Sequence, residues 1–160
     1  MGVFVKTAVL LVLGCLASGA SAAAPEMRIV DAWVQAAPPK TKVLAAYMKI
    51  ENGREMPQTI LGVSGPGIER VEIHRTVMHG NMAHMEQLKE LAILPRTTTA
   101  LQPGGLHFML INPKQAFKIG DRVPMTLSLK GGGTLAFEAT VRAARMADTA
   151  GSAHREHSGH

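Results

Sequence analysis

The chain has 160 residues, of which 46% are hydrophobic, 18% charged and 4% aromatic, and its formal net charge is +5. This length suits one domain with tails, and the ordinary apolar content excludes disorder for most of the chain. A single cysteine, Cys15, excludes a disulfide scaffold.

Residues 1–22 have the pattern of a secretory signal peptide. Lys6 precedes an apolar stretch that is too short to span a membrane, and small residues follow up to Ala22, a pattern that signal peptidase cleaves. The competing interpretation is a lipoprotein signal in which Cys15 is lipidated after cleavage. We favour soluble export because Leu13 is bulky for its place in a lipoprotein signal. Export excludes nucleic acid as the partner of this basic chain, and the mature protein has no other run that approaches transmembrane length.

Residues 23–146 are predicted to form one β domain. Apolar and polar side chains alternate with a period of two in three segments, residues 44–51, 123–130 and 135–141. Glycines at 131–133 separate the last two segments, which predicts a hairpin. Further glycines and prolines divide the rest into short strands, and many short strands with turns between them favour a β-sandwich or Greek-key barrel.

Two segments depart from this pattern. Residues 85–91 contain good helix formers at i, i+3 spacing, so the pattern alone leaves helix or strand open. Residues 147–160 are rich in Ala, Ser, Gly and His and are predicted to be a disordered tail. The large aromatic residues Trp33 and Phe137 are expected in the core of the β domain.

Histidine and methionine gather in one part of the chain, at His74, Met78, His79, Met82, His84, Met85, His107 and Met109. On a strand, His107 and Met109 point to the same side, about 6.6 Å apart. The Pro-Gly-Gly sequence at 103–105 places the pair near a strand end, where a metal could reach it. Imidazole plus thioether is a soft ligand set that suits Cu(I), whereas zinc more often recruits thiolate or carboxylate. The alternative is that Met109 fills the core and His107 is a hydrogen-bonded surface residue.

A second pair of residues extends this set. His74 ends the sequence Val-Glu-Ile-His at 71–74, and Met85 follows a polar, glycine-containing segment, residues 75–84, that we expect to be a loop folding back over the site. Together they give the spacing H-x10-M-x21-H-x-M. This spacing resembles the signature of the periplasmic copper chaperone family PCu(A)C. Three stretches, 71–74, 101–110 and 120–127, are also similar to stretches typical of that family, and the resemblance covers roughly residues 27–143.

The resemblance implies a fold, a cargo and a destination. The fold would be an all-β, cupredoxin-like Greek-key sandwich or barrel, in which residues 86–91 are largely strand or loop. Cu(I) would be bound by imidazole nitrogens and thioether sulfurs of His74, Met85, His107 and Met109. The protein would lie in the periplasm and deliver copper towards assembly of cytochrome c oxidase, at the subunit with the dinuclear CuA site. Delivery would be direct or through another copper assembly chaperone.

Several alternatives are weighed against this interpretation. The mature chain has no thiol, which excludes a type 1 copper centre and a thiol-disulfide reductase. We find no carboxylate–histidine pairing that assigns a catalytic base, so we expect no enzyme. A periplasmic copper buffer or resistance protein fits the same residues. A metal-free β-sandwich interaction domain is the third class, with coincidental Met and His.

Two further groups of side chains are candidate metal ligands. The segment before Met85 contains four such residues, Met78, His79, Met82 and His84. The sequence is equally compatible with two roles for them: auxiliary metal ligands, or methionines that pack the segment and histidines that are solvated. In the tail, His154, His157 and His160 recur at a spacing of three without sulfur nearby, which suits Cu(II). A solvated tail or an artificial tag is the alternative there.

Overall fold

The computed structural model describes residues 26–143, which form ten β-strands and no helix, so no helix among them could cross a membrane. The signal peptide, the ends of the predicted domain and the tail histidines lie outside the described residues. The strands are β1 Met27–Gln35, β2 Val43–Asn52, β3 Gln58–Ser64, β4 Ile68–His79, β5 Met82–Leu88, β6 Leu91–Ile93, β7 Thr97–Leu101, β8 Leu106–Pro113, β9 Arg122–Leu129 and β10 Thr134–Arg142.

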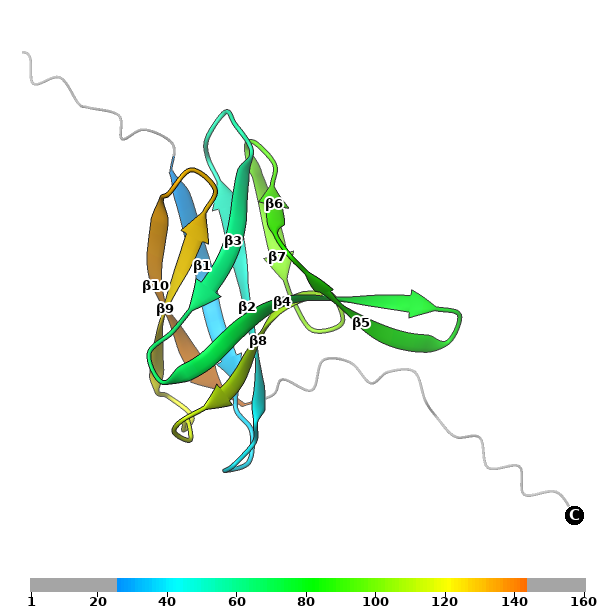
Figure 1. Cartoon of the computed structure of the whole chain (residues 1–160), viewed down its shortest axis with the longest axis vertical. Coiled ribbons are helices and arrows are strands. Elements are labelled where there is room, and N and C mark those ends of the chain that lie inside the picture. Colours follow the sequence, from blue (N-terminus) through cyan, green and yellow to red (C-terminus); the bar gives the residue numbers. More distant parts are fainter. Residues whose placement is uncertain (1–25, 144–160) are drawn as a thin grey trace, which may run out of the picture.

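Seven of these strands close a barrel (Figure 1), in the order β4-β8-β2-β1-β10-β9-β3. Pairing of Val63 on β3 with Val71 on β4 completes the ring. Neighbouring strands are antiparallel except β1 and β10, which run parallel. The remaining strands are attached at the side: β5 to β4, β6 to β3 and β7 to β2. The predicted all-β, cupredoxin-like fold is confirmed, and so is the β9–β10 hairpin.

The core is formed by the inward side chains of the strands, whose alternation with outward side chains was predicted from the sequence. Inward positions of β2, β8, β9 and β10 are buried, and they include Ala46, Met48, Ile50, Phe108, Leu110, Val123, Met125, Leu127, Ala139 and Val141. Because successive side chains of a strand point to opposite faces, the residues between them line the outside of the barrel. His107 and Met109 are the outward residues that flank Phe108 on β8.

A bulge in β1 overturns one core prediction. Met27 is buried before the bulge and Val34 after it, so the inward positions change from odd to even numbers. The pairing register shifts between Val30 and Trp33, and Asp31 has a φ of 52°. An extra residue in one strand moves every later side chain to the other face. Trp33 is therefore half-buried on the outer face, and its expected place in the core is wrong.

The segment before Met85 is not a loop. Residues 75–79 continue β4, residues 82–88 form β5, and Gly80 and Asn81 make a two-residue turn in which Gly80 has a φ of 61°. Positive φ at the first central residue is the requirement of a type II′ hairpin turn. The predicted loop is thus wrong, because cross-strand pairing runs without interruption from Ile73–Leu88 to His79–Met82.

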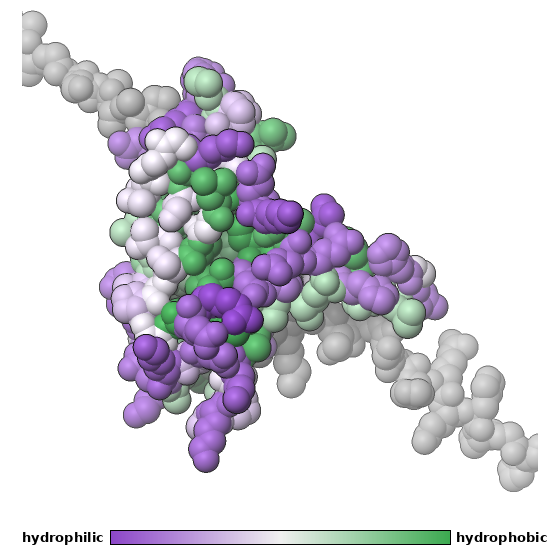
Figure 2. Space-filling view, in the orientation of Figure 1, coloured by the Kyte–Doolittle hydropathy of each residue, from purple (hydrophilic) through white to green (hydrophobic). Residues whose placement is uncertain are grey.

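The β4–β5 hairpin, which projects from the barrel, contains most of the segment that the sequence pattern left open between helix and strand. Residues 85–91 are mainly strand, as the family resemblance implied, and not helix. Regular pairing of β4 with β8 ends at Arg75. Beyond it, the Thr76 N–H still donates to the Gly105 carbonyl, and the remaining residues of β4 pair with β5. Figure 1 shows this hairpin extending sideways, and Figure 2 shows a mixture of hydrophilic and mildly hydrophobic residues on its surface.

Candidate metal site

The four predicted ligands share the outer face of the sheet formed by β5, β4 and β8. His74 on β4 is directly opposite His107 on β8, and Met109 is opposite Glu72. Met85 on β5 is opposite Thr76, which is two residues beyond His74 on the same face of β4. Directly opposed residues of an antiparallel pair have their side chains on one face. The pairing therefore gathers side chains from three strands at one place.

His107 is only 6% exposed and its ring is held in a defined orientation. Its Nδ1 lies 3.0 Å from the carbonyl oxygen of Gly105, which also accepts the backbone N–H of Thr76 at 3.1 Å. A carbonyl oxygen can only accept, so Nδ1 carries the proton and donates it. The Nε2 atom of the neutral ring then offers its lone pair, as a metal ligand must.

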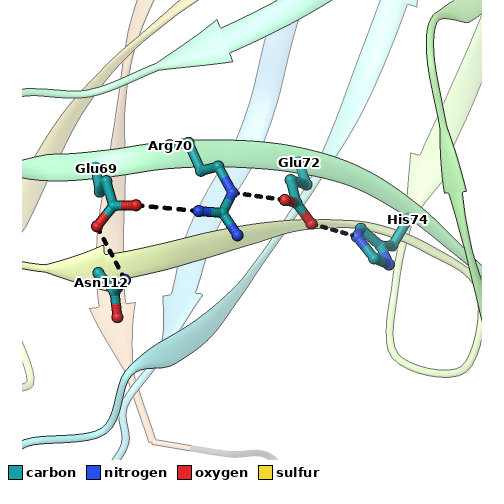
Figure 3. Close-up of polar contacts among 5 residues, drawn as sticks. All are labelled: Glu69, Arg70, Glu72, His74 and Asn112. Atoms are coloured by element: carbon teal, nitrogen blue, oxygen red, sulfur yellow. Dashed lines mark hydrogen bonds and ion pairs between the residues drawn. The ribbon is translucent and has the colours of Figure 1, made fainter.

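His74 is oriented by a carboxylate. Its Nε2 lies 2.9 Å from Oε2 of Glu72. Figure 3 shows this contact as a dashed line. An ionised carboxylate only accepts, so Nε2 carries the proton and Nδ1 bears the lone pair. That Nδ1 atom is buried and has no hydrogen-bond partner. A buried polar atom without a partner is uncommon and destabilising, and a soft cation next to it would satisfy it.

Glu72 belongs to a row of polar contacts along β4 (Figure 3). Nε of Arg70 donates to Oε1 of Glu72 at 2.7 Å, and Arg70 also donates to Glu69, which accepts from the Asn112 amide at 2.9 Å. The Arg70 guanidinium, and after it the His74 ring, hold the pKa of Glu72 below its ordinary value of 4.5. Glu72 is therefore ionised at neutral pH and can fix the orientation of the His74 ring.

The two thioethers differ in exposure. Met85, His107 and Met109 line one open cleft, together with Tyr47 and Thr76. Met85 is 65% exposed, which places this residue at the rim of the cleft. Met109 is half-buried between Ala45 on β2 and Glu72 on β4. His74 does not line the cleft, but its ring centroid lies 5.9 Å from that of His107.

The chemistry of this donor set depends on sulfur. Among residues 26–143, no three side chains drawn from His, Cys, Asp and Glu gather in a way that could hold a metal. The usual ligand sets of zinc, calcium and magnesium are thus missing from the described part of the chain. Two imidazoles and two thioethers form a neutral, soft set that suits Cu(I).

Sequence reasoning missed two contributions to the site. The sequence pattern did not predict the contact between the Glu72 carboxylate and the His74 imidazole. Tyr47 alternates with the core residues Ala46 and Met48 and so is at an outward position of β2, yet it is buried, and burial raises its pKa above 10.0. Its ring stands between Trp33, at 4.7 Å, and His107, at 6.3 Å. The only sequence signal was an aromatic residue among the outward positions of a strand.

The auxiliary candidates in the hairpin fall on two faces. Met78 is on the face of β4 that carries His74 and Thr76, but it does not line the cleft. Its three companions, His79, Met82 and His84, are on the opposite face of the hairpin. The structure therefore separates these three from the four predicted ligands.

Comparison with known proteins yields one family and several relatives. A family model described as "LpqE-like: Putative lipoprotein LpqE-like" matches residues 27–141. The chain is 29% identical over 109 residues to the "Putative lipoprotein Lxx21020" of Leifsonia xyli subsp. xyli. This match covers 68% of the chain, and the chain spans only 64% of that relative's length.

Solved structures have the same fold. The solution structure of CuI-DR1885 from Deinococcus radiodurans is 34% identical, with a TM-score of 0.60, and the match covers 78% of this chain and 83% of that one. The copper-bound PCuAC domain from PmoF2 is 21% identical, with a TM-score of 0.64, over 76% of this chain and 96% of that domain. At that lower identity, the PmoF2 likeness bears on the fold alone.

Proposed function

The chain belongs to the LpqE-like family and, as its motif predicted, to the PCu(A)C family, and from this we propose that it carries one Cu(I) ion bound by His74, Met85, His107 and Met109. Copper is the cargo of this protein and not a resident cofactor.

The unpartnered Nδ1 of His74 is the observation that carries the proposal. The His74 ring centroid lies 5.9 Å from that of a second imidazole, His107, whose Nε2 is unused, and the side chains of Met85 and Met109 are on the same face. The 34% identical DR1885 is described as its CuI form, which supports the same oxidation state here. A thioether ligand also survives an oxidising compartment, where paired thiols tend to form disulfides.

The geometry favours a carrier over a store. All four ligands are neutral, so Cu(I) keeps its positive charge and is held less tightly than by thiolates. Met85 is exposed at the rim, where a ligand of an acceptor could replace its sulfur. We expect a non-enzymatic chaperone that delivers copper towards the CuA site of cytochrome c oxidase, directly or through another assembly chaperone. A copper buffer is the second candidate.

Export to the periplasm is part of the proposal. The words "Putative lipoprotein" stand in the descriptions of both the family and the Leifsonia relative, which supports keeping lipidation of Cys15 as an alternative to cleavage after Ala22. Mass spectrometry of the mature N-terminus distinguishes the two. A chain starting after Ala22 supports soluble export, and a lipid-modified Cys15 supports anchoring to a membrane.

Replacement of the two sulfurs tests the metal site. In the Met85→Leu, Met109→Leu variant the side chains keep their size and apolar character, so the loss of stability should stay below about 1.5 kcal/mol for each change. Cu(I) affinity, measured by competition with a chromophoric Cu(I) chelator, should fall at least about tenfold. Met56→Leu is the control, since Met56 is exposed, as Met85 is, but lies outside the cleft.

The outcome of this test separates the remaining classes of protein. If the double variant binds Cu(I) as tightly as the parent chain, the assignment of the ligands is wrong. If neither chain binds Cu(I), the metal-free interaction domain is the better description.

The tail is proposed as a separate Cu(II) site that collects the metal before its reduction. Its ligands would be His154, His157 and His160, set among residues without sulfur. Replacing all three by alanine should remove a Cu(II)-selective binding event and leave Cu(I) binding unchanged. An unaltered Cu(II) stoichiometry would defeat this part of the proposal.

A further inference from the structure

The projecting β4–β5 hairpin carries a second group of metal-binding side chains on the face turned away from the cleft. His79 is directly opposite Met82, and His84 is opposite Val77, so these residues share one face. The face that carries Met85 and Thr76 is the other one. His79, Met82 and His84 therefore form a separate cluster, named here the hairpin cluster.

The two imidazoles of this cluster already lie together. Their ring centroids are 5.3 Å apart in an edge-to-face arrangement, although His79 and His84 are diagonal and not direct partners across the strands. Two-stranded ribbons twist strongly, which brings one diagonal pair of side chains close together. The two-residue turn at Gly80 holds the strands in this register.

All three side chains are accessible. Met82 is 65% exposed, and both histidines are exposed as well. Within residues 26–143, neither imidazole makes a hydrogen bond or an ion pair, and their one ring contact is with each other. An exposed methionine beside two uncommitted imidazoles contributes nothing to the core of the barrel, so its thioether is free to act as a ligand.

We propose that the hairpin cluster is a second Cu(I) site, with the imidazoles of His79 and His84 and the thioether of Met82 as ligands. Two nitrogens and one sulfur make a neutral, soft set that fits Cu(I) better than hard cations. Glu86 shares this face, but its carboxylate is paired with Arg75 at 3.0 Å. The site lies on the opposite face of the hairpin from the cleft, so the two sites share no ligand.

Methyl NMR of methionine in the full chain tests the proposal, with Cu(I) added under anaerobic conditions. The Met82 methyl resonance and the imidazole resonances of His79 and His84 should shift with a second equivalent of Cu(I). Met82→Leu should weaken binding of the second Cu(I) at least about tenfold. Replacing residues that only contact metal ligands already lowers metal affinity by about that factor, and Met82 is proposed as a ligand itself. Met78→Leu is the matched control: Met78 is 63% exposed but on the opposite face of the hairpin.

The NMR shifts distinguish Cu(I) binding at the hairpin cluster from Cu(I) binding at the cleft. Shifts at Met82 without shifts at Met85 and Met109 would support the hairpin site and overturn the cleft site. Shifts at Met85 and Met109 alone, up to two equivalents of Cu(I), would overturn the hairpin site. Equal behaviour of Met82→Leu and Met78→Leu would overturn it too. A His79→Asn, His84→Asn variant, altered only at exposed positions, should lose the second event and retain the first.

Discussion

His74 on β4 and His107 on β8 are direct partners on neighbouring strands, and the centroids of their imidazole rings are 5.9 Å apart. Each ring has one nitrogen occupied by a different acceptor, the Glu72 carboxylate for His74 and the Gly105 carbonyl for His107. The atoms left with lone pairs are Nδ1 of His74 and Nε2 of His107. The two histidines thus offer copper different nitrogens of the ring.

Long-range 1H–15N NMR of the metal-free chain checks these tautomers. We expect the Nε2–H tautomer for His74 and the Nδ1–H tautomer for His107, because carbonyl and carboxylate oxygens can only accept. Adding Cu(I) should shift the Nδ1 resonance of His74 and the Nε2 resonance of His107. The reverse tautomer at either residue would contradict the assignment of donor atoms.

Replacing Glu72 by glutamine should weaken Cu(I) binding about tenfold without unfolding the chain, because Glu72 orients a ligand and is not one itself. A chelator competition measures the affinity, and circular dichroism checks the fold. Glu69→Gln is the control, since Glu69 contacts Arg70 and Asn112 but not His74. Equal affinities of the Glu72→Gln and Glu69→Gln variants would show that the carboxylate–imidazole contact has no role in binding.

The stability of the metal-free protein should depend on Glu72 in acid. The folded-state pKa of Glu72 lies below its ordinary value of 4.5, mainly because of Arg70. A lowered pKa stabilises the fold above the unfolded value, and this contribution is lost as the pH falls through the folded value. Urea unfolding should show the parent chain more stable than Glu72→Gln at pH 7, with the difference shrinking at about pH 3. A difference that does not change with pH would exclude ionisation of Glu72 as its source.

Cu(I) should leave the loaded chain for an acceptor whose site contains thiolates. Thiolates are stronger ligands for Cu(I) than neutral imidazole and thioether, so transfer runs towards the acceptor. Mixing the loaded chain with a reduced CuA-site subunit or copper assembly chaperone, then separating the two, should find the metal on the acceptor within minutes. Copper that stays on this chain would favour the buffer.

The strand pattern could be read from the sequence because the alternation of side chains along a strand depends on local order. A period of two in 44–51, 123–130 and 135–141 places the core residues wherever a strand is regular. The four candidate ligands were predicted from the resemblance of the spacing H-x10-M-x21-H-x-M to the PCu(A)C signature, and the structure places these residues on one face of the sheet. Residues 85–91 could not be assigned by pattern alone, since helix formers also occur in strands that tertiary contacts hold in place.

Register between distant strands was decided only by the tertiary structure. The bulge at Asp31 reverses the inward side of β1, which places Trp33 outside against Tyr47. The pairing of β4 with β8 sets His74 against His107, and the pairing of β4 with β5 turns a predicted loop into a hairpin. The faces of Met82 and Met85 on that hairpin follow from this second pairing. Sequence determines which side chains alternate along each strand, whereas the alignment of one strand with another depends on the packing of the whole barrel.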